Sequence, residues 1–188
     1  MGRYVLGPLP EGVLAVTYAD DAEPLVPSDF SLSEYRDVQA RALSGARTIS
    51  RIVDETKRER ASDSHRILTN LVAARIRVAG AMPRCNQFVD LAGRIGKTPF
   101  LFEIKSTTED NVRGQIRRGI SQLYEYRYLQ RASDAQLVLV IEKPLGQELA
   151  WMVEYLVRDR GILLVWDGDM RTLHCPSWLK RQLSFLVA

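Results

Sequence analysis

The chain has 188 residues, of which 46% are hydrophobic and 26% are charged, and this composition excludes a wholly disordered protein. The 26 basic residues nearly balance the 23 acidic residues, so the net charge of +3 does not by itself identify a nucleic acid as a partner. The two cysteines exclude a disulfide framework, and no apolar run approaches the roughly 20 residues that a membrane span needs. We therefore expect a cytoplasmic protein that does not associate with membranes.

The N-terminal part of the chain predicts extended structure followed by two helices. Prolines and a short alternating run favour a strand pair or an extended arm in the first 30 residues. The pattern Ser-Leu-Ser-Glu at 31–34 is typical of a capping box, and it predicts a helix over about 33–60. A second helix is expected over about 64–79, because its apolar residues form one stripe and Gly80 can end it.

Beyond residue 80 the pattern changes to short apolar runs that alternate with amphipathic segments. A turn at 93–96 separates the first two of these runs, and a continuous apolar run predicts a strand that is buried on both faces. The expected strands lie at 88–92, 100–105, 135–141, 162–166 and 171–174, and the expected helices lie at 111–131, around 149–157 and at 178–186. This alternation predicts an α/β fold with a central mixed β-sheet flanked by helices.

Charged residues occur where the second of these strands should be apolar. Strand alternation places Leu101, Glu103 and Lys105 on one face of the segment 100–105. Glu and Lys rarely occupy buried strand positions without a partner or a metal. Asp90, on the preceding strand of the expected hairpin, can stand beside Glu103. The alternative is that Glu103 and Lys105 form a surface pair on an edge strand and that Asp90 is an ordinary acid beside a turn.

Two carboxylates that repel each other are natural ligands of a divalent cation. Mg²⁺ is typically held by one or two carboxylates together with water and phosphate. We therefore expect Asp90, Glu103 and the backbone carbonyl of Ile104 to hold Mg²⁺, for which Mn²⁺ can substitute. Lys105 can then orient the attacking water or stabilise charge on the scissile phosphate. This set of groups favours phosphodiester hydrolysis.

The arrangement of Asp90 followed by Glu103-Ile104-Lys105 resembles the PD-(D/E)XK nuclease superfamily. The proline that names the motif is absent, since Val89 precedes Asp90. The following helix carries Gln122 and Tyr126 one turn apart, which is similar to the Q-x-x-x-Y motif of RecB-type nuclease domains.

The resemblance covers about residues 64–166. It implies a restriction-endonuclease-like core of αβββαβ type within a domain spanning 63–188, preceded by an accessory region at 1–62. It also implies a Mg²⁺-dependent deoxyribonuclease.

The same resemblance implies roles for the two helix residues. Gln122 would act in catalysis by hydrogen bonding near the metal-bound water or the phosphate, and Tyr126 would contact substrate or brace the site. Five other residues are candidates for binding substrate, namely Asn86, Ser106, Arg113, Arg117 and Arg118. The three arginines can bind backbone phosphates, although a solvated basic face is an equal alternative.

DNA is the expected substrate, with RNA as an alternative, and the pathway could be restriction, phage defence or repair. A chain this small that cuts duplex DNA would suggest a homodimer. The alternative to an enzyme is a catalytically inactive nuclease-fold protein that binds nucleic acid or a protein partner. A further alternative is a structural protein in which the charged residues form a buried ionic network.

Overall fold

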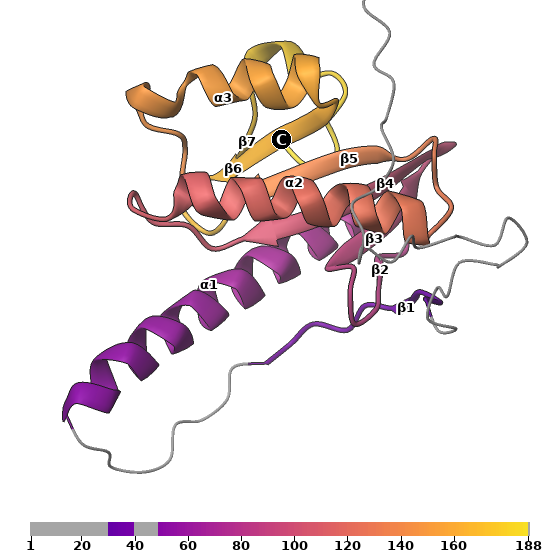
Figure 1. The fold of residues 1–188 in the computed structure, drawn as a ribbon. Helices are drawn as coiled ribbons and strands as arrows, with labels where there is room; N and C mark the ends of the chain where they lie inside the picture. The colour runs from indigo at the N-terminus through magenta and orange to yellow at the C-terminus, as the bar shows by residue number, and fades with distance from the viewer. Residues whose placement is uncertain (1–29, 40–48, 188) are drawn as a thin grey trace, which may run out of the picture.

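Figure 1 shows the fold in a computed structural model, which describes residues 30–39 and 49–187, with side chains for 30–39 and 63–187. The strand pair expected in the first 30 residues lies outside the described residues. Seven strands form one sheet in the order β1 to β7. Their bounds are Ser33–Glu34 (β1), Arg84–Cys85 (β2), Leu91–Ile95 (β3), Thr98–Lys105 (β4), Gln136–Ile141 (β5), Ile162–Asp167 (β6) and Leu173–His174 (β7).

The sheet is mixed. Strands β1 to β4 pair antiparallel, β5 is parallel to β4, β6 is parallel to β5, and β7 returns antiparallel to β6. Each parallel connection carries helical structure, as crossovers between parallel strands usually do. Helix α2 (Val112–Leu129) joins β4 to β5. The β5–β6 connection contains η1 (Gln147–Leu149), α3 (Trp151–Glu154) and a π-helical turn η2 (Tyr155–Asp159).

Helices cover both faces of the sheet, and the two faces form separate apolar clusters. On one face, Leu68, Val72 and Ile76 of helix α1 (Ile49–Val78) pack with the side chains of Phe102 and Ile104. On the other face, the apolar residues of α2 and α3 pack against alternate residues of β4, β5 and β6. The predicted α/β class, with a mixed sheet flanked by helices, is therefore confirmed (Figure 1).

The predicted start of the first helix is wrong. Ser33 and Glu34 form strand β1, which pairs with β2, and the next residue, Tyr35, is buried in the cluster on the α1 side. The Tyr35 N–H donates to the carbonyl of Pro83 at 2.9 Å. Pairing with distant parts of the chain thus satisfies the backbone N–H and C=O groups that the capping pattern would have satisfied at the start of a helix.

The two expected helices are instead joined, because α1 runs without a break from Ile49 to Val78. A separate second helix would need Asp63 or Ser64 as its N-cap, but Ser64 is buried within α1, where its hydroxyl donates to Oε1 of Glu142 instead of accepting a backbone N–H. The expected domain boundary at residue 62 falls inside this helix, and the division of the chain remains a prediction.

Two local expectations also need correction. The turn expected at 93–96 is shifted, because Gly93 lies inside β3 and the chain reverses at Gly96 and Lys97, between paired Ile95 and Thr98. Gly96 has φ of 59°, a conformation that favours glycine. The C-terminal segment forms only a short 3₁₀ turn, η3 (Ser177–Leu179), followed by turns, instead of a helix over 178–186.

Candidate active site

Glu103 and Lys105 lie at the C-terminal end of β4, which is the central strand of the sheet. The Glu103 side chain is 1% exposed and the Lys105 side chain is 16% exposed, and the Lys105 ammonium pairs with Oε1 of Glu103. Oε2 of Glu103 is buried and has no hydrogen-bond partner among the described residues. A surface pair on an edge strand is therefore ruled out. A buried carboxylate oxygen without a partner is costly, and it indicates a site that a cation can complete.

Asp90 immediately precedes β3 and reaches across to β4. Its Oδ2 accepts the N–H of Ile104 at 2.9 Å. On the other side of β4, the Lys105 carbonyl accepts the N–H of Glu142 from the chain that follows β5. Because successive backbone groups of a strand point to alternate sides, the carbonyl of Ile104 points to the Asp90 side. Asp90 and the backbone of Ile104 are therefore in contact, next to Glu103 on the same strand, and the binding of a metal by these groups remains a prediction.

The charge of Asp90 acts on Glu103. Burial, followed by the negative charge of Asp90, raises the pKa of Glu103 from 4.5 to about 7, although Lys105 acts in the opposite direction. The negative charge of Asp90 therefore disfavours the ionised form of Glu103. A divalent cation placed between the two carboxylates would remove this effect and keep Glu103 ionised.

Helix α2 lies against Glu103 and places Tyr126 near it. Tyr126 is buried, and burial together with the charge of Glu103 raises its pKa. The Gln122 amide donates to the Tyr126 hydroxyl at 3.1 Å. These contacts favour a bracing role for Tyr126 over contact with substrate. The expected action of Gln122 on water or phosphate remains a prediction.

Gly119 of α2 lets the helix approach the strand that carries Glu103. A Cβ atom at this position would lie 2.6 Å from Cδ1 of Leu139 and 3.6 Å from Cγ of Glu103. We expect Gly119→Ala to destabilise the protein by about 1–3 kcal/mol through overpacking. Gly114→Ala is the matched control, because a Cβ there meets nothing within 4 Å and alanine favours a helix. Urea unfolding measures both, and equal stabilities of the two variants would contradict this packing.

His65 of α1 lies at the site; its place near an expected helix start, beside Arg66, could suggest a substrate-facing residue, but the sequence gives it no partner at metal-ligand spacing. Its Nε2 lies 3.3 Å from Oδ2 of Asp90, and this hydrogen bond is the main cause of the raised pKa of His65. The Thr69 hydroxyl donates to the His65 carbonyl at 2.6 Å. The spacing of His65, Leu68 and Val72 places the imidazole on the apolar stripe of α1, which is a signal that could have indicated inward orientation.

Glu142 is a residue that the sequence did not identify. It follows β5, and its Oε2 accepts the Ser106 hydroxyl at 2.6 Å and the Thr107 N–H at 3.2 Å. Its Oε1 accepts the Ser64 hydroxyl at 3.2 Å. Glu142 therefore holds the segment after Lys105 against α1. Its position directly after a parallel strand could have indicated that Glu142 lies beside the end of β4, because the carboxyl ends of parallel strands β4 and β5 meet at one edge of the sheet.

The remaining expected substrate-binding residues have different settings. The Ser106 hydroxyl donates a hydrogen bond to Glu142, as described above. The side-chain oxygen Oδ1 of Asn86 accepts the N–H groups of Phe88 and Val89 at 2.9 and 2.8 Å, so Asn86 shapes the turn that leads to Asp90. Contact of either side chain with substrate remains a prediction.

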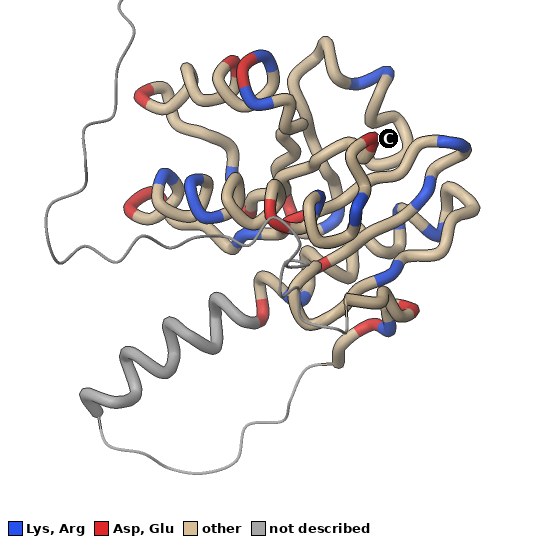
Figure 2. The backbone as a smooth tube through the Cα atoms, turned by 45° about the vertical axis from the view of Figure 1, so that its right-hand side comes forward, with Lys and Arg blue, Asp and Glu red and all other residues tan. Residues whose placement is uncertain are grey.

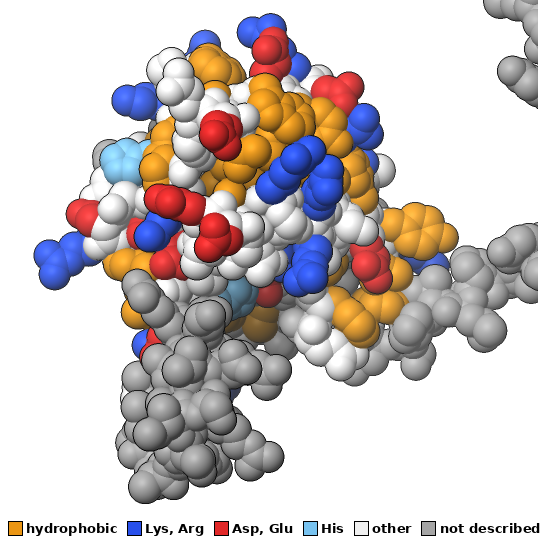
Figure 3. All heavy atoms as spheres, turned by 60° about the vertical axis from the view of Figure 1, so that its left-hand side comes forward, with side chains coloured by type: hydrophobic (Ala, Val, Ile, Leu, Met, Phe, Trp, Pro, Cys, Tyr) orange, Lys and Arg blue, Asp and Glu red, His pale blue; other side chains and the backbone are white. Residues whose placement is uncertain are grey.

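The three arginines lie on the first half of α2. Arg113, Arg117 and Arg118 are exposed, and none forms an ion pair with another described residue. Figure 2 shows basic and acidic residues interspersed along the backbone, and in Figure 3 basic side chains gather on one face beside several acidic ones. These guanidinium groups are therefore available to bind phosphates.

The carboxylates of Asp90 and Glu103 are oxygen donors of the kind that Mg²⁺ prefers, and binding of Mg²⁺ there remains a prediction. Residues 30–39 and 63–187 contain no cluster of three or more His, Cys, Asp and Glu side chains that could hold a metal. A Mg²⁺ site does not need such a cluster, because water and substrate phosphate complete its oxygen ligands. The unpartnered Oε2 of Glu103 and the carbonyl of Ile104 supply hard oxygen donors of the required kind.

Comparison with known proteins identifies no relative: no family model, no curated protein and no solved structure matches the chain. None of the helices in the described part of the chain has the length and apolar character that crossing a membrane requires. Inferences about function therefore depend on the site itself.

Proposed function

We propose that this protein is a Mg²⁺-dependent nuclease that hydrolyses phosphodiester bonds of DNA. The observation that carries the proposal is the buried Glu103–Lys105 pair on the central strand, beside Asp90. The two charges lose hydration when they are buried, and replacing a buried ion pair by apolar residues of similar volume is often neutral or stabilising. A contribution to stability therefore does not by itself explain the pair. Buried charges with shifted pKa values are typical of catalytic sites.

The order of elements supports a restriction-endonuclease-like core. Helix α1, strands β2, β3 and β4, helix α2 and strand β5 follow each other in the order αβββαβ that the PD-(D/E)XK resemblance implies. Asp90 precedes β3, Glu103 and Lys105 end β4, and Gln122 and Tyr126 lie on α2. Glu103, Lys105, Gln122 and Tyr126 lie on the strand and the helix expected for them, whereas Asp90 lies just before its strand and not on it. This order of residues supports the proposal.

In the proposed mechanism, Asp90, Glu103 and the carbonyl of Ile104 would hold the metal. When bound, Mg²⁺ supplies positive charge that neutralises the carboxylates and polarises the scissile phosphate. The Lys105 ammonium donates to the attacking water or to a phosphate oxygen, and its charge stabilises the negative charge that grows on the phosphate during attack. Tyr126, whose hydroxyl accepts the Gln122 amide, would brace Glu103 from the helix.

Binding of the DNA strand is assigned to α2. Arg113, Arg117 and Arg118 would contact phosphates of the backbone, which supports affinity without reading sequence. DNA binding should therefore weaken as the salt concentration rises.

A panel of labelled oligonucleotides tests the proposed activity. Single-stranded, duplex and forked DNA, with RNA of the same sequence, are incubated with the protein in Mg²⁺ or in EDTA. The proposal predicts shortened DNA products in Mg²⁺ and none in EDTA. Binding of DNA without any products, in either Mg²⁺ or Mn²⁺, would contradict it and favour an inactive nuclease-fold protein that binds nucleic acid.

A further inference from the structure

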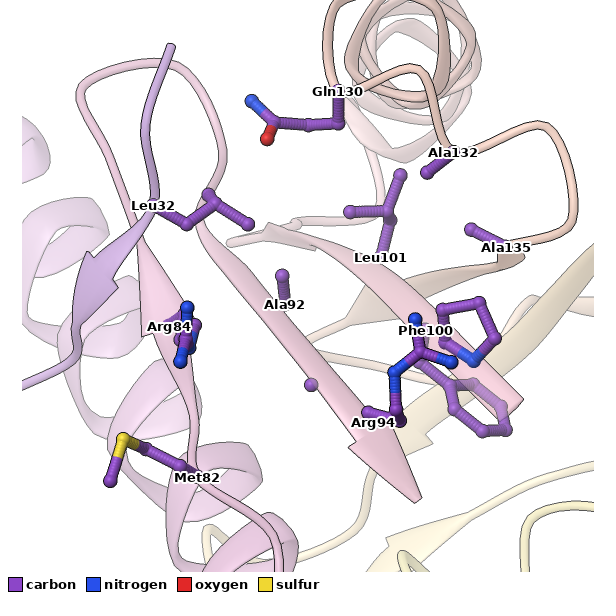
Figure 4. A pocket seen from close by; sticks show the side chains of 12 residues that line it. Leu32, Met82, Arg84, Ala92, Arg94, Phe100, Leu101, Gln130, Ala132 and Ala135 are labelled. Atoms are coloured by element: carbon purple, nitrogen blue, oxygen red, sulfur yellow. The ribbon is translucent and has the colours of Figure 1, made fainter. Parts of the chain in front are cut away.

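A cavity of about 450 Å³ opens on the α2 side of the sheet, at the end of β4 opposite to Lys105 (Figure 4). Strands β2, β3 and β4 and the chain that follows α2 form its walls. Its apolar floor includes Ala92 and Leu101, which belong to the cluster on the α2 side. This volume is within the range of sites that bind small molecules.

Two arginines supply the charge of the cavity. Arg84 lies opposite Ala92 in the register of β2 and β3, and Arg94 lies two residues further along β3, so all three side chains share one face. Among the described residues that line the cavity there is no Asp or Glu. Glu34 lies opposite Arg84 in the register of β1 and β2, yet no ion pair joins them in the described structure. Arg94 also donates from one guanidinium nitrogen to the Lys97 carbonyl at 3.0 Å, which holds its side chain beside the turn between β3 and β4. A guanidinium group has five N–H donors, so this bond leaves Arg94 able to bind an anion together with Arg84.

The rest of the lining suits a flat ring. Gly93, Ala92, Ala132 and Ala135 are small and leave smooth walls, and Figure 4 shows the alanines facing the same space as Leu101. The Gln130 amide nitrogen donates to the Phe30 carbonyl at 2.9 Å, which holds the side chain at the rim. The amide oxygen of Gln130 can then accept a hydrogen bond from a ring amino group.

We propose that this cavity binds one nucleotide, with its base against Ala92 and Leu101 and its phosphate between Arg84 and Arg94. Guanidinium groups bind phosphate strongly because they offer paired donors. The ligand is either a free mononucleotide or an unpaired nucleotide of a strand, since a base inside a duplex cannot enter a cavity. The inference goes beyond the proposed function, because it uses none of the residues of the candidate active site.

Calorimetric titration in EDTA tests this assignment without any cleavage step. The probes are a 5′-mononucleotide such as dAMP, the matching nucleoside and inorganic phosphate. We expect saturable binding of the mononucleotide, and binding at least about tenfold weaker for the nucleoside and for phosphate, because each lacks one half of the ligand. Phosphate that binds as tightly as the mononucleotide would overturn the assignment.

Variants locate the binding. The double variant R84A/R94A should weaken mononucleotide binding at least about tenfold, and Ala132→Phe should do the same by filling the cavity while both charges remain. The matched control R171A/R181A removes two exposed arginines elsewhere and should leave binding unchanged. Failure of the wild type to bind the mononucleotide, or equal binding by R84A/R94A, overturns the proposal.

A short single strand distinguishes the two sources of the ligand. Tighter binding of a single-stranded oligonucleotide than of the mononucleotide, lost in R84A/R94A, identifies the strand as the source. Equal or weaker binding of the strand identifies the free nucleotide. These readouts do not depend on cleavage, so failure of the nuclease proposal and failure of this one are distinguishable.

Discussion

Replacing Lys105 with alanine is expected to lower the rate of Mg²⁺-dependent DNA cleavage by about 10²- to 10³-fold, as is typical when one group that stabilises transition-state charge is removed. Lys105 is the cation that pairs with Glu103 at the end of β4. Alanine leaves no donor for the attacking water or for the charge that grows on the phosphate. Single-turnover cleavage of the preferred DNA substrate measures the effect.

Lys97→Ala is the matched control for this experiment. Lys97 is exposed in the turn before β4, at the opposite end of the strand from Lys105. Its replacement should leave the cleavage rate within about twofold of wild type, because substitutions at exposed positions far from the active site have small effects. Full activity of Lys105→Ala would show that the proposed mechanism is wrong.

Replacing Glu103 with glutamine is expected to abolish cleavage and to stabilise the protein at alkaline pH. The pKa of Glu103 is raised from 4.5 to about 7, so the folded state binds this proton more tightly than the unfolded state. The free energy of unfolding therefore falls as the pH rises from about 4.5 through 7. The total loss, fully present above pH 7, is about 3 kcal/mol. Glutamine is neutral at every pH and removes this penalty.

Urea unfolding at pH 5 and pH 8 measures this second effect. The stability of Glu103→Gln should exceed that of the wild type at pH 8 by up to about 3 kcal/mol, with only a small difference at pH 5. Glu148→Gln, at an exposed position, is the control and should show no such pH dependence. A variant that is less stable than the wild type at pH 8 would mean that ionised Glu103 stabilises the fold.

The parts of the fold that depend on local patterns were predictable from the sequence. The alternation in 100–105 correctly placed Glu103 and Lys105 on one buried face, and the apolar run at 135–141 correctly indicated a strand buried on both faces. These patterns are short and repeat with the period of a strand, so they need no knowledge of distant residues.

The features that depend on distant contacts were not predictable. His65 meets Asp90 across 25 residues, and Glu142 meets Ser64 across 78 residues. The capping pattern at 31–34 was misleading because β1 pairs with β2, about 50 residues further along the chain. In each case a tertiary contact decided the outcome and outweighed the local preference.

The most direct test of the central claim compares cleavage by the wild type with cleavage by Asp90→Asn on the same DNA in Mg²⁺. Asparagine can still accept the N–H of Ile104, yet it lacks the negative charge that would hold the metal beside Glu103. We predict a fall in rate of at least about 10²-fold for Asp90→Asn, and no change for Lys97→Ala. An Asp90→Asn variant that cleaves as fast as the wild type would contradict the account.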